Sequence, residues 1–154
     1  KPFKIGDFIS TNSGVSGTVQ AIDIFHTKLV TPQNQLIVIP NGVVSNNSIT
    51  NFTQLGTRRT SLDIGVAYDA DLKQTKELLM NVIRNNQYAL ATPVPQVVVT
   101  ELGESAVNLS VRVSASIENY WAMNEELIIG CKEALDKAGI GIPFPQRDIH
   151  VYNQ

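Results

Sequence analysis

Short runs of apolar residues, separated by turn residues, fill the first third of the chain. Strands are expected at residues 8–9, after a turn at Gly6 and Asp7, and at residues 17–25, 26–31, 36–39 and 49–53, because these runs are short and most alternate apolar with polar side chains. The Gly, Pro, Asn and Ser residues between them favour tight turns. Five short strands in about 55 residues favour a small closed barrel, because closure removes exposed strand edges.

The pattern changes after residue 59, where strand and helix periods are mixed. Residues 60–67 alternate apolar and polar side chains, which predicts a strand with one face in water. Residues 72–84 then place their apolar side chains on one stripe at helical spacing. Asp69 precedes this helix and is a good N-cap residue, and Asn85 follows its last turn.

A second group of elements completes this part of the chain. Strands are expected at residues 96–102 and 107–117, and a helix is expected at residues 119–138, where Gly139 ends it. A last short strand is expected at residues 147–152, after a tract rich in Gly and Pro. The resulting order is that of the split βαβ unit in a ferredoxin-like sandwich, so the fold class is α+β.

The segment between the two patterns has no periodicity. It contains Gly56 and ends in two adjacent cations, Arg58 and Arg59, which is typical of a linker between domains. The two arginines are open to two interpretations. They are either the solvated start of the next strand or a charged rim at an opening.

Composition limits the function. The chain has 154 residues, of which 43% are apolar and 17% charged, and its net charge of −2 argues against nucleic acid as a partner. No apolar run approaches the roughly 20 residues that a membrane-spanning helix needs. The chain begins without Met and inside a motif, so we expect it to be part of a longer protein whose upstream segment is missing.

No arrangement of residues predicts catalysis, a metal site or a cofactor site. His26 and His150 are far apart in the sequence and have no metal-ligand spacing. Asp69 and Asp71 could act as an acid–base pair, but helix capping explains both. Cys131 falls on the inner side of the second helix and is expected to be a core residue.

One stretch organises the first part of the chain. Residues 36–52 read as a strand, a tight corner at Pro40, Asn41 and Gly42, and a second strand. Pro40 ends the first strand, and Asn41 and Gly42 both tolerate positive φ. Such a corner either reverses the chain and does nothing more, or presents a fixed surface to a neighbouring element.

The same stretch carries a family resemblance. Its pattern IVIPNGxxxxNxIxNF at 37–52 resembles the middle-domain signature of small-conductance mechanosensitive channels of the MscS type. Four further motifs resemble landmarks of that family in the same order: KPFxxGD at 1–7, GVAYD at 65–69, ELGxS at 101–105 and IPFPQ at 142–146. The resemblance covers essentially the whole chain.

The resemblance implies a domain organisation and an assembly. Residues 1–55 would form an Sm-like β domain, 56–59 a linker, 60–141 a ferredoxin-like domain, and 142–154 a Pro-containing tail with a terminal strand. It implies a homoheptamer on the cytoplasmic side of the bacterial inner membrane, joined to the membrane through N-terminal helices. This cage would support the pore helices and pass ions and small osmolytes through side portals during hypoosmotic shock.

The resemblance also assigns roles to particular residues. Pro40, Asn41 and Gly42 would form the corner that faces the pore helix, and Arg58 and Arg59 would rim a portal. In the family the tail strands form a parallel barrel on the symmetry axis, which here would contain Asp148, Ile149, His150 and Val151. The competing interpretation is that this strand closes the ferredoxin-like sheet.

Two other functions remain open at this stage. The chain could be a soluble oligomeric scaffold without channel activity, or an RNA-binding ring, since both expected folds also bind RNA. The polar side chains expected between Asn108 and Ser116 include one Arg and no aromatic residue for stacking on bases, which disfavours RNA. The catalytic alternative is the weakest of all.

Overall fold

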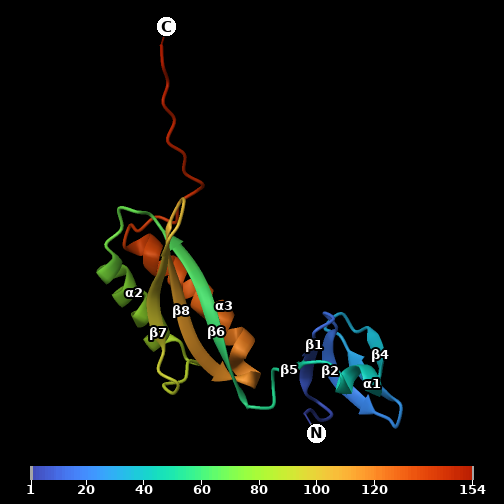
Figure 1. Ribbon diagram of the computed structural model, residues 1–154. Coiled ribbons are helices and arrows are strands. Elements are labelled where there is room, and N and C mark those ends of the chain that lie inside the picture. Colours follow the sequence, from blue (N-terminus) through green and yellow to red (C-terminus); the bar gives the residue numbers. More distant parts are fainter. Residues whose placement is uncertain (1, 154) are drawn as a thin grey trace. The chain divides into compact units, whose positions relative to one another are not determined.

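The computed structural model describes residues 2–153 and contains two compact units, residues 1–58 and residues 59–154 (Figure 1). Each unit has its own hydrophobic core. The α+β class expected from the sequence is confirmed, since the chain holds two sheets and a few helices. Among residues 2–153, no helix combines the length and the apolar character that crossing a bilayer requires.

The first unit is an antiparallel sheet with one short helix. Its elements follow one another along the chain: β1 (Phe8–Thr11), β2 (Ser16–Ile22), β3 (His26–Val30), β4 (Leu36–Pro40), α1 (Asn41–Ser45) and β5 (Ile49–Asn51). The strands are hydrogen-bonded in the order β4-β3-β2-β1-β5, so β4 and β5 stand at the two ends of that order. Gly6, at φ 95°, turns the chain just before the first strand, as expected from the sequence.

Tight packing between β2 and β3 depends on Gly17. A Cβ atom at this position would lie 2.9 Å from the carbonyl oxygen of Val30 and 3.0 Å from the Cβ of Leu29. The side chains of Val19 and Leu29, which pair across these strands, are fully buried in the core of the unit. The absence of a side chain at Gly17 therefore allows the two strands to approach.

The second unit is a three-stranded sheet with two helices packed on one face (Figure 1). Its elements are β6 (Thr57–Val66), α2 (Leu72–Asn85), β7 (Gln96–Leu102), β8 (Val107–Ser116), a 3₁₀ turn η1 (Ile117–Asn119) and α3 (Tyr120–Lys137). The order β6-β8-β7 places β8 between the other two strands, as the split βαβ unit requires. Residues 57–59, expected within a linker, are the first residues of β6.

The ends of the helices show one correction. Asp71, and not Asp69, caps α2, because its side chain accepts a hydrogen bond from the backbone N–H of Gln74 at 3.1 Å. The end of α3 is as expected: Gly139 has φ 72°, and its N–H donates to the carbonyl of Asp136 at 3.1 Å.

The strand expected at residues 147–152 is wrong for the single chain. Residues 141–153 contain no helix or strand, and their side chains are mostly exposed. The segment is fixed at its base, where Gly141 accepts a hydrogen bond from Ala67 and the N–H of Gln146 donates to Ser105 Oγ. A β-strand needs a neighbour for its peptide groups. This segment finds none among the described residues, so it does not close the sheet beside β6.

Gly17→Ala should destabilise the first unit by about 1–3 kcal/mol, because the new methyl group meets backbone atoms that cannot move aside. Gly42→Ala is the matched control, since a Cβ at Gly42 meets nothing within 4 Å. Urea unfolding, with amide hydrogen exchange at β2 and β3, distinguishes the two. Equal stability of the two variants would contradict the packing argument.

Candidate functional site

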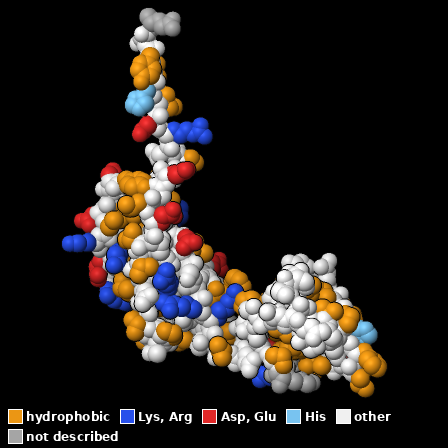
Figure 2. All heavy atoms as spheres, in the orientation of Figure 1, with side chains coloured by type: hydrophobic (Ala, Val, Ile, Leu, Met, Phe, Trp, Pro, Cys, Tyr) orange, Lys and Arg blue, Asp and Glu red, His pale blue; other side chains and the backbone are white. Residues whose placement is uncertain are grey.

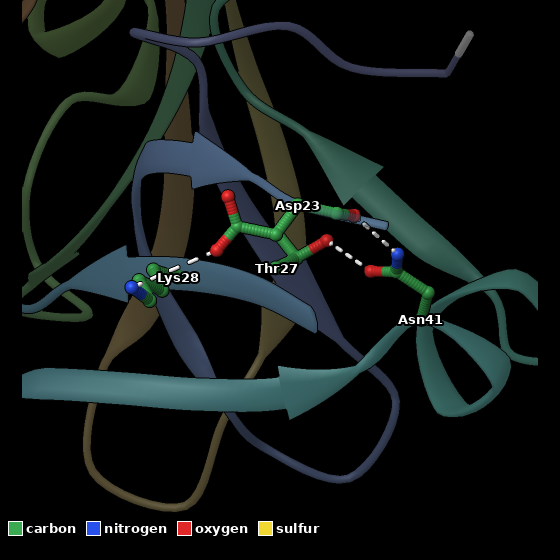
Figure 3. A network of polar contacts seen from close by, with 4 residues as sticks. All are labelled: Asp23, Thr27, Lys28 and Asn41. Carbon is green, nitrogen blue, oxygen red and sulfur yellow. Dashed lines mark hydrogen bonds and ion pairs between the residues drawn. The ribbon is translucent and has the colours of Figure 1, made fainter. Parts of the chain in front are cut away.

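The corner after β4 is built around the side chain of Asn41. Its Nδ2 donates to the carbonyl oxygens of Asp23 at 2.8 Å and Ile24 at 2.9 Å, and its Oδ1 accepts from Thr27 Oγ1 at 2.7 Å. The backbone N–H of Asn41 also donates to the carbonyl of Phe25 at 2.8 Å. One residue therefore binds the whole turn between β2 and β3 (Figure 3).

The corner turns in a different way from the one expected. Neither Asn41 nor Gly42 has positive φ; instead the chain enters α1 directly after Pro40. Pro40 itself pairs with His26 as the last residue of β4. Residues 40–42 are thus brought together with the β2–β3 turn, whose Ile24 and Phe25 side chains are 86% and 74% exposed.

An apolar hollow lies beside this corner. Its volume is about 540 Å³, and its lining includes Phe3, Ile22, Val44 and Ile49 next to Asn41. The ion pair between Lys28 and Asp23 lies close by, at 3.6 Å, with both side chains largely exposed (Figure 3). An exposed pair of this kind adds little stability, so the Asn41 hydrogen bonds are what define the corner.

The two arginines that were expected to act together have different partners. The guanidinium carbon of Arg58 lies 4.6 Å from the centroid of the Phe52 ring, a cation–π contact, and the side chain is half-buried. Arg59 is exposed, and its Nη2 donates to Gln96 Oε1 at 3.4 Å. The Phe52 ring also packs against Phe8, with 5.7 Å between centroids. Adjacent strand residues point to opposite faces, which explains the separation.

The tail residues Asp148, Ile149, His150 and Val151 are all exposed in the single chain. Ile149 and Val151 each expose most of an apolar side chain. Leaving this apolar surface in water costs free energy.

Sequence reasoning missed a buried carboxylate at the start of the first unit. Asp7 is 4% exposed and accepts hydrogen bonds from Lys4 N at 3.0 Å, Asn51 Nδ2 at 2.9 Å and Thr53 Oγ1 at 3.0 Å. The hydrogen bond from Asn51 is the main cause that lowers the pKa of Asp7 below its ordinary value, against the effect of burial. This cluster ties residues 4–7 to residues 51–53.

The chemical groups of an enzyme or metal site do not assemble within residues 2–153. No group of three His, Cys, Asp or Glu residues there is close enough to hold a metal ion. Cys131 is buried, and burial raises the pKa of its thiol to about 12. It therefore packs as a small apolar residue in the core of the second unit.

Comparison with known proteins defines the class. Residues 1–54 match the family model described as the mechanosensitive ion channel β-domain, and residues 60–142 match the one described as the C-terminal part of the mechanosensitive ion channel MscS. The chain therefore belongs to the MscS family of mechanosensitive ion channels, which are not enzymes. This confirms the resemblance seen in the sequence motifs.

Individual relatives agree with this assignment. The small-conductance mechanosensitive channel of Edwardsiella ictaluri is 39% identical over 152 residues, covering 99% of this chain and 53% of that protein. The crystal structure of Helicobacter pylori MscS in its closed state superposes with a TM-score of 0.92 at 35% identity, over 99% of this chain and 60% of that one. A structure of Arabidopsis thaliana MSL1 shares the fold at 20% identity and a TM-score of 0.77, over 92% of this chain and 53% of that one. The chain spans about half the length of the curated relatives it matches.

Asn41→Ala should loosen the β2–β3 turn, because it leaves Thr27 Oγ1 and two backbone carbonyls without this partner. We expect a loss of about 1–3 kcal/mol in the stability of the first unit. Faster amide exchange at residues 23–27 is the direct measurement. Asn46→Ala, at an exposed position just after α1, is the control, and similar exchange in both variants would contradict the role of Asn41.

Asp7 should make the first unit sensitive to acid. Because its folded pKa lies below its ordinary value of 3.8, the stability it contributes is present above that value and is lost as pH falls through the folded pKa. Asp7→Asn should lower stability at neutral pH by about 1–3 kcal/mol and flatten the fall in stability between about pH 5 and pH 2. Urea unfolding across this range measures both effects. An unchanged slope in Asp7→Asn would refute the assignment.

Proposed function

We propose that this chain is the cytoplasmic vestibule of a mechanosensitive ion channel. The observation that carries this proposal is the order of the two matches, with the channel β-domain at residues 1–54 followed by the MscS C-terminal region at residues 60–142. In this proposal seven copies form a hollow ring on the cytoplasmic side of the bacterial inner membrane. Helices in the remaining half of the protein would span the membrane and form the pore.

The vestibule has no chemistry to perform. It supports the pore helices in a ring and lets ions and small osmolytes pass through side portals when hypoosmotic shock opens the channel. The family assignment gives no support to the alternatives of a free scaffold or an RNA-binding ring. The proposed domains are 1–55 as an Sm-like β domain, 60–141 as the ferredoxin-like domain and 142–154 as the tail. The junction at 56–59 is not a free linker, because residues 57–59 are the first residues of β6.

The corner at Pro40, Asn41 and Gly42 is the surface that receives the pore helix. Rigidity supports this role, because the hydrogen bonds of Asn41 fix α1 and the β2–β3 turn as one body. The exposed Ile24 and Phe25 side chains supply apolar area for a helix to pack on.

The portal and the axis are formed by other residues. Arg58 and Arg59 rim the portal, with Arg59 the more exposed of the two. The tail strands containing Asp148, Ile149, His150 and Val151 pair around the symmetry axis as a parallel barrel. Pairing between copies would satisfy the peptide groups of the tail, which lack a strand partner in the single chain.

A chimeric channel tests the function. Residues 1–154 replace the corresponding half of the Edwardsiella ictaluri channel, and the chimera is expressed in bacteria that lack their own mechanosensitive channels. We expect survival of hypoosmotic shock and tension-gated currents in membrane patches. The unmodified channel is the positive control, and its membrane half alone is the negative control. A chimera that reaches the membrane at the level of the unmodified channel but carries no tension-gated current would overturn the proposal.

A further inference from the structure

The outer surface of α3 carries an acidic stripe, defined here as Glu125, Ile129 and Glu133. These residues are four apart along the helix, so they lie one above the other on one face. Ile129 is 50% exposed, and both glutamates are exposed. Together with Tyr88 and Ala122 they line a shallow hollow of about 400 Å³.

The flank of α2 carries a basic stripe with the same spacing, defined here as Lys73, Lys76, Met80 and Arg84. Lys76, Met80 and Arg84 are also four residues apart, and Met80 is half-buried between exposed cations. These side chains, with Pro95 and Val98 at the edge of the sheet, line a hollow of about 520 Å³. The same hollow contains one carboxylate, Glu77, which forms an ion pair with Arg84 at 3.1 Å. Figure 2 shows Lys and Arg side chains gathered on the side of this unit where α2 and β7 lie.

The two stripes match in length as well as in charge. Eight residues of α-helix span about 12 Å, so the cations at Lys76 and Arg84 are as far apart as the carboxylates at Glu125 and Glu133. Each pair of charges encloses one apolar side chain, Met80 in one stripe and Ile129 in the other. Charge complementarity around an apolar centre is the usual pattern of a specific protein–protein contact.

The basic stripe and the acidic stripe of one copy cannot form ion pairs with each other. Helices α2 and α3 pack through Val82 and Gly130, where a Cβ on Gly130 would lie 2.8 Å from Val82 Cγ1. At 100° per residue, Lys76 and Met80 lie on the side of α2 away from Val82, and so away from α3. Arg84 is paired with Glu77 of its own helix, with 3.1 Å between Nη1 and Oε1, so Lys73 and Lys76 are the cations that the basic stripe offers to a different molecule.

We propose that the basic stripe of one copy receives the acidic stripe of the next copy. The occupant is a second copy because both complementary faces belong to the same chain. Because the two faces differ, the contact is head-to-tail, and head-to-tail contacts generate rings when the rotation closes. The inference rests on the proposed function in requiring several copies, and it adds the surfaces that join the second units.

Paired charge reversals test the contact. The variant Lys73→Glu/Lys76→Glu makes both stripes acidic, and the variant Glu125→Lys/Glu133→Lys makes both basic. All four positions are exposed, so the fold should persist, which circular dichroism checks. Analytical ultracentrifugation and native mass spectrometry of the 154-residue chain then measure assembly.

Each variant alone should assemble at least about tenfold more weakly than the wild type, because like charges then face each other. An equimolar mixture should assemble again and contain both variants in each complex, because a ring of seven alternating copies has only one contact between like charges. The double variant Glu104→Lys/Glu118→Lys changes charge equally at exposed positions outside the stripes, and it should assemble like the wild type.

Three results would overturn the inference. If each stripe variant assembles as the wild type does, the chain self-associates but the proposed contact between stripes is refuted. If the wild type assembles and the mixture of variants stays monomeric, or if no sample assembles, the contact also falls. The currents of the chimeric channel decide the proposed function independently, because they do not depend on either outcome.

Discussion

Peptide groups without partners are the constraint on which this structure depends. In the first unit β4 and β5 end the hydrogen-bonded order, and in the second unit β6 and β7 do so. The tail at residues 141–153 is extended and has no strand beside it in the described chain. Exposed strand edges and an exposed apolar tail are features that isolated domains avoid. Both are accounted for if copies of the chain supply the missing neighbours.

The two units reach stability by different means. The core of the second unit has sixteen buried apolar residues, whereas the core of the first has six. A core of six side chains gives limited hydrophobic stabilisation. The first unit adds polar ties over long distances in sequence: Asp7 joins residues 51 and 53, and Asn41 joins residues 23–27. These hydrogen bonds fix the position where the chain enters the unit and the turn between β2 and β3, so the small sheet can act as a rigid support.

Periodicity was sufficient to predict the elements, because alternation and helical stripes reflect which side chains are buried. It predicted every strand of both sheets and both long helices. It named Asp69 as the cap where Asp71 is the cap, since both residues precede the helix and only the backbone conformation decides between them. It missed Asp7, whose side-chain partners Asn51 and Thr53 are more than forty residues away. It predicted a strand in the tail from alternation alone, but a strand also needs a neighbour, which a single sequence does not specify.

The lone cysteine has a practical consequence. Cys131 is almost completely buried, and its thiol has a pKa of about 12, so very little thiolate exists near neutral pH. Because the chain contains no other cysteine, the native protein offers little background to maleimide or spin-label reagents. A cysteine introduced at an exposed position would therefore be labelled selectively without removing the natural one. Distances between copies could then be measured by spectroscopy in an otherwise unaltered protein.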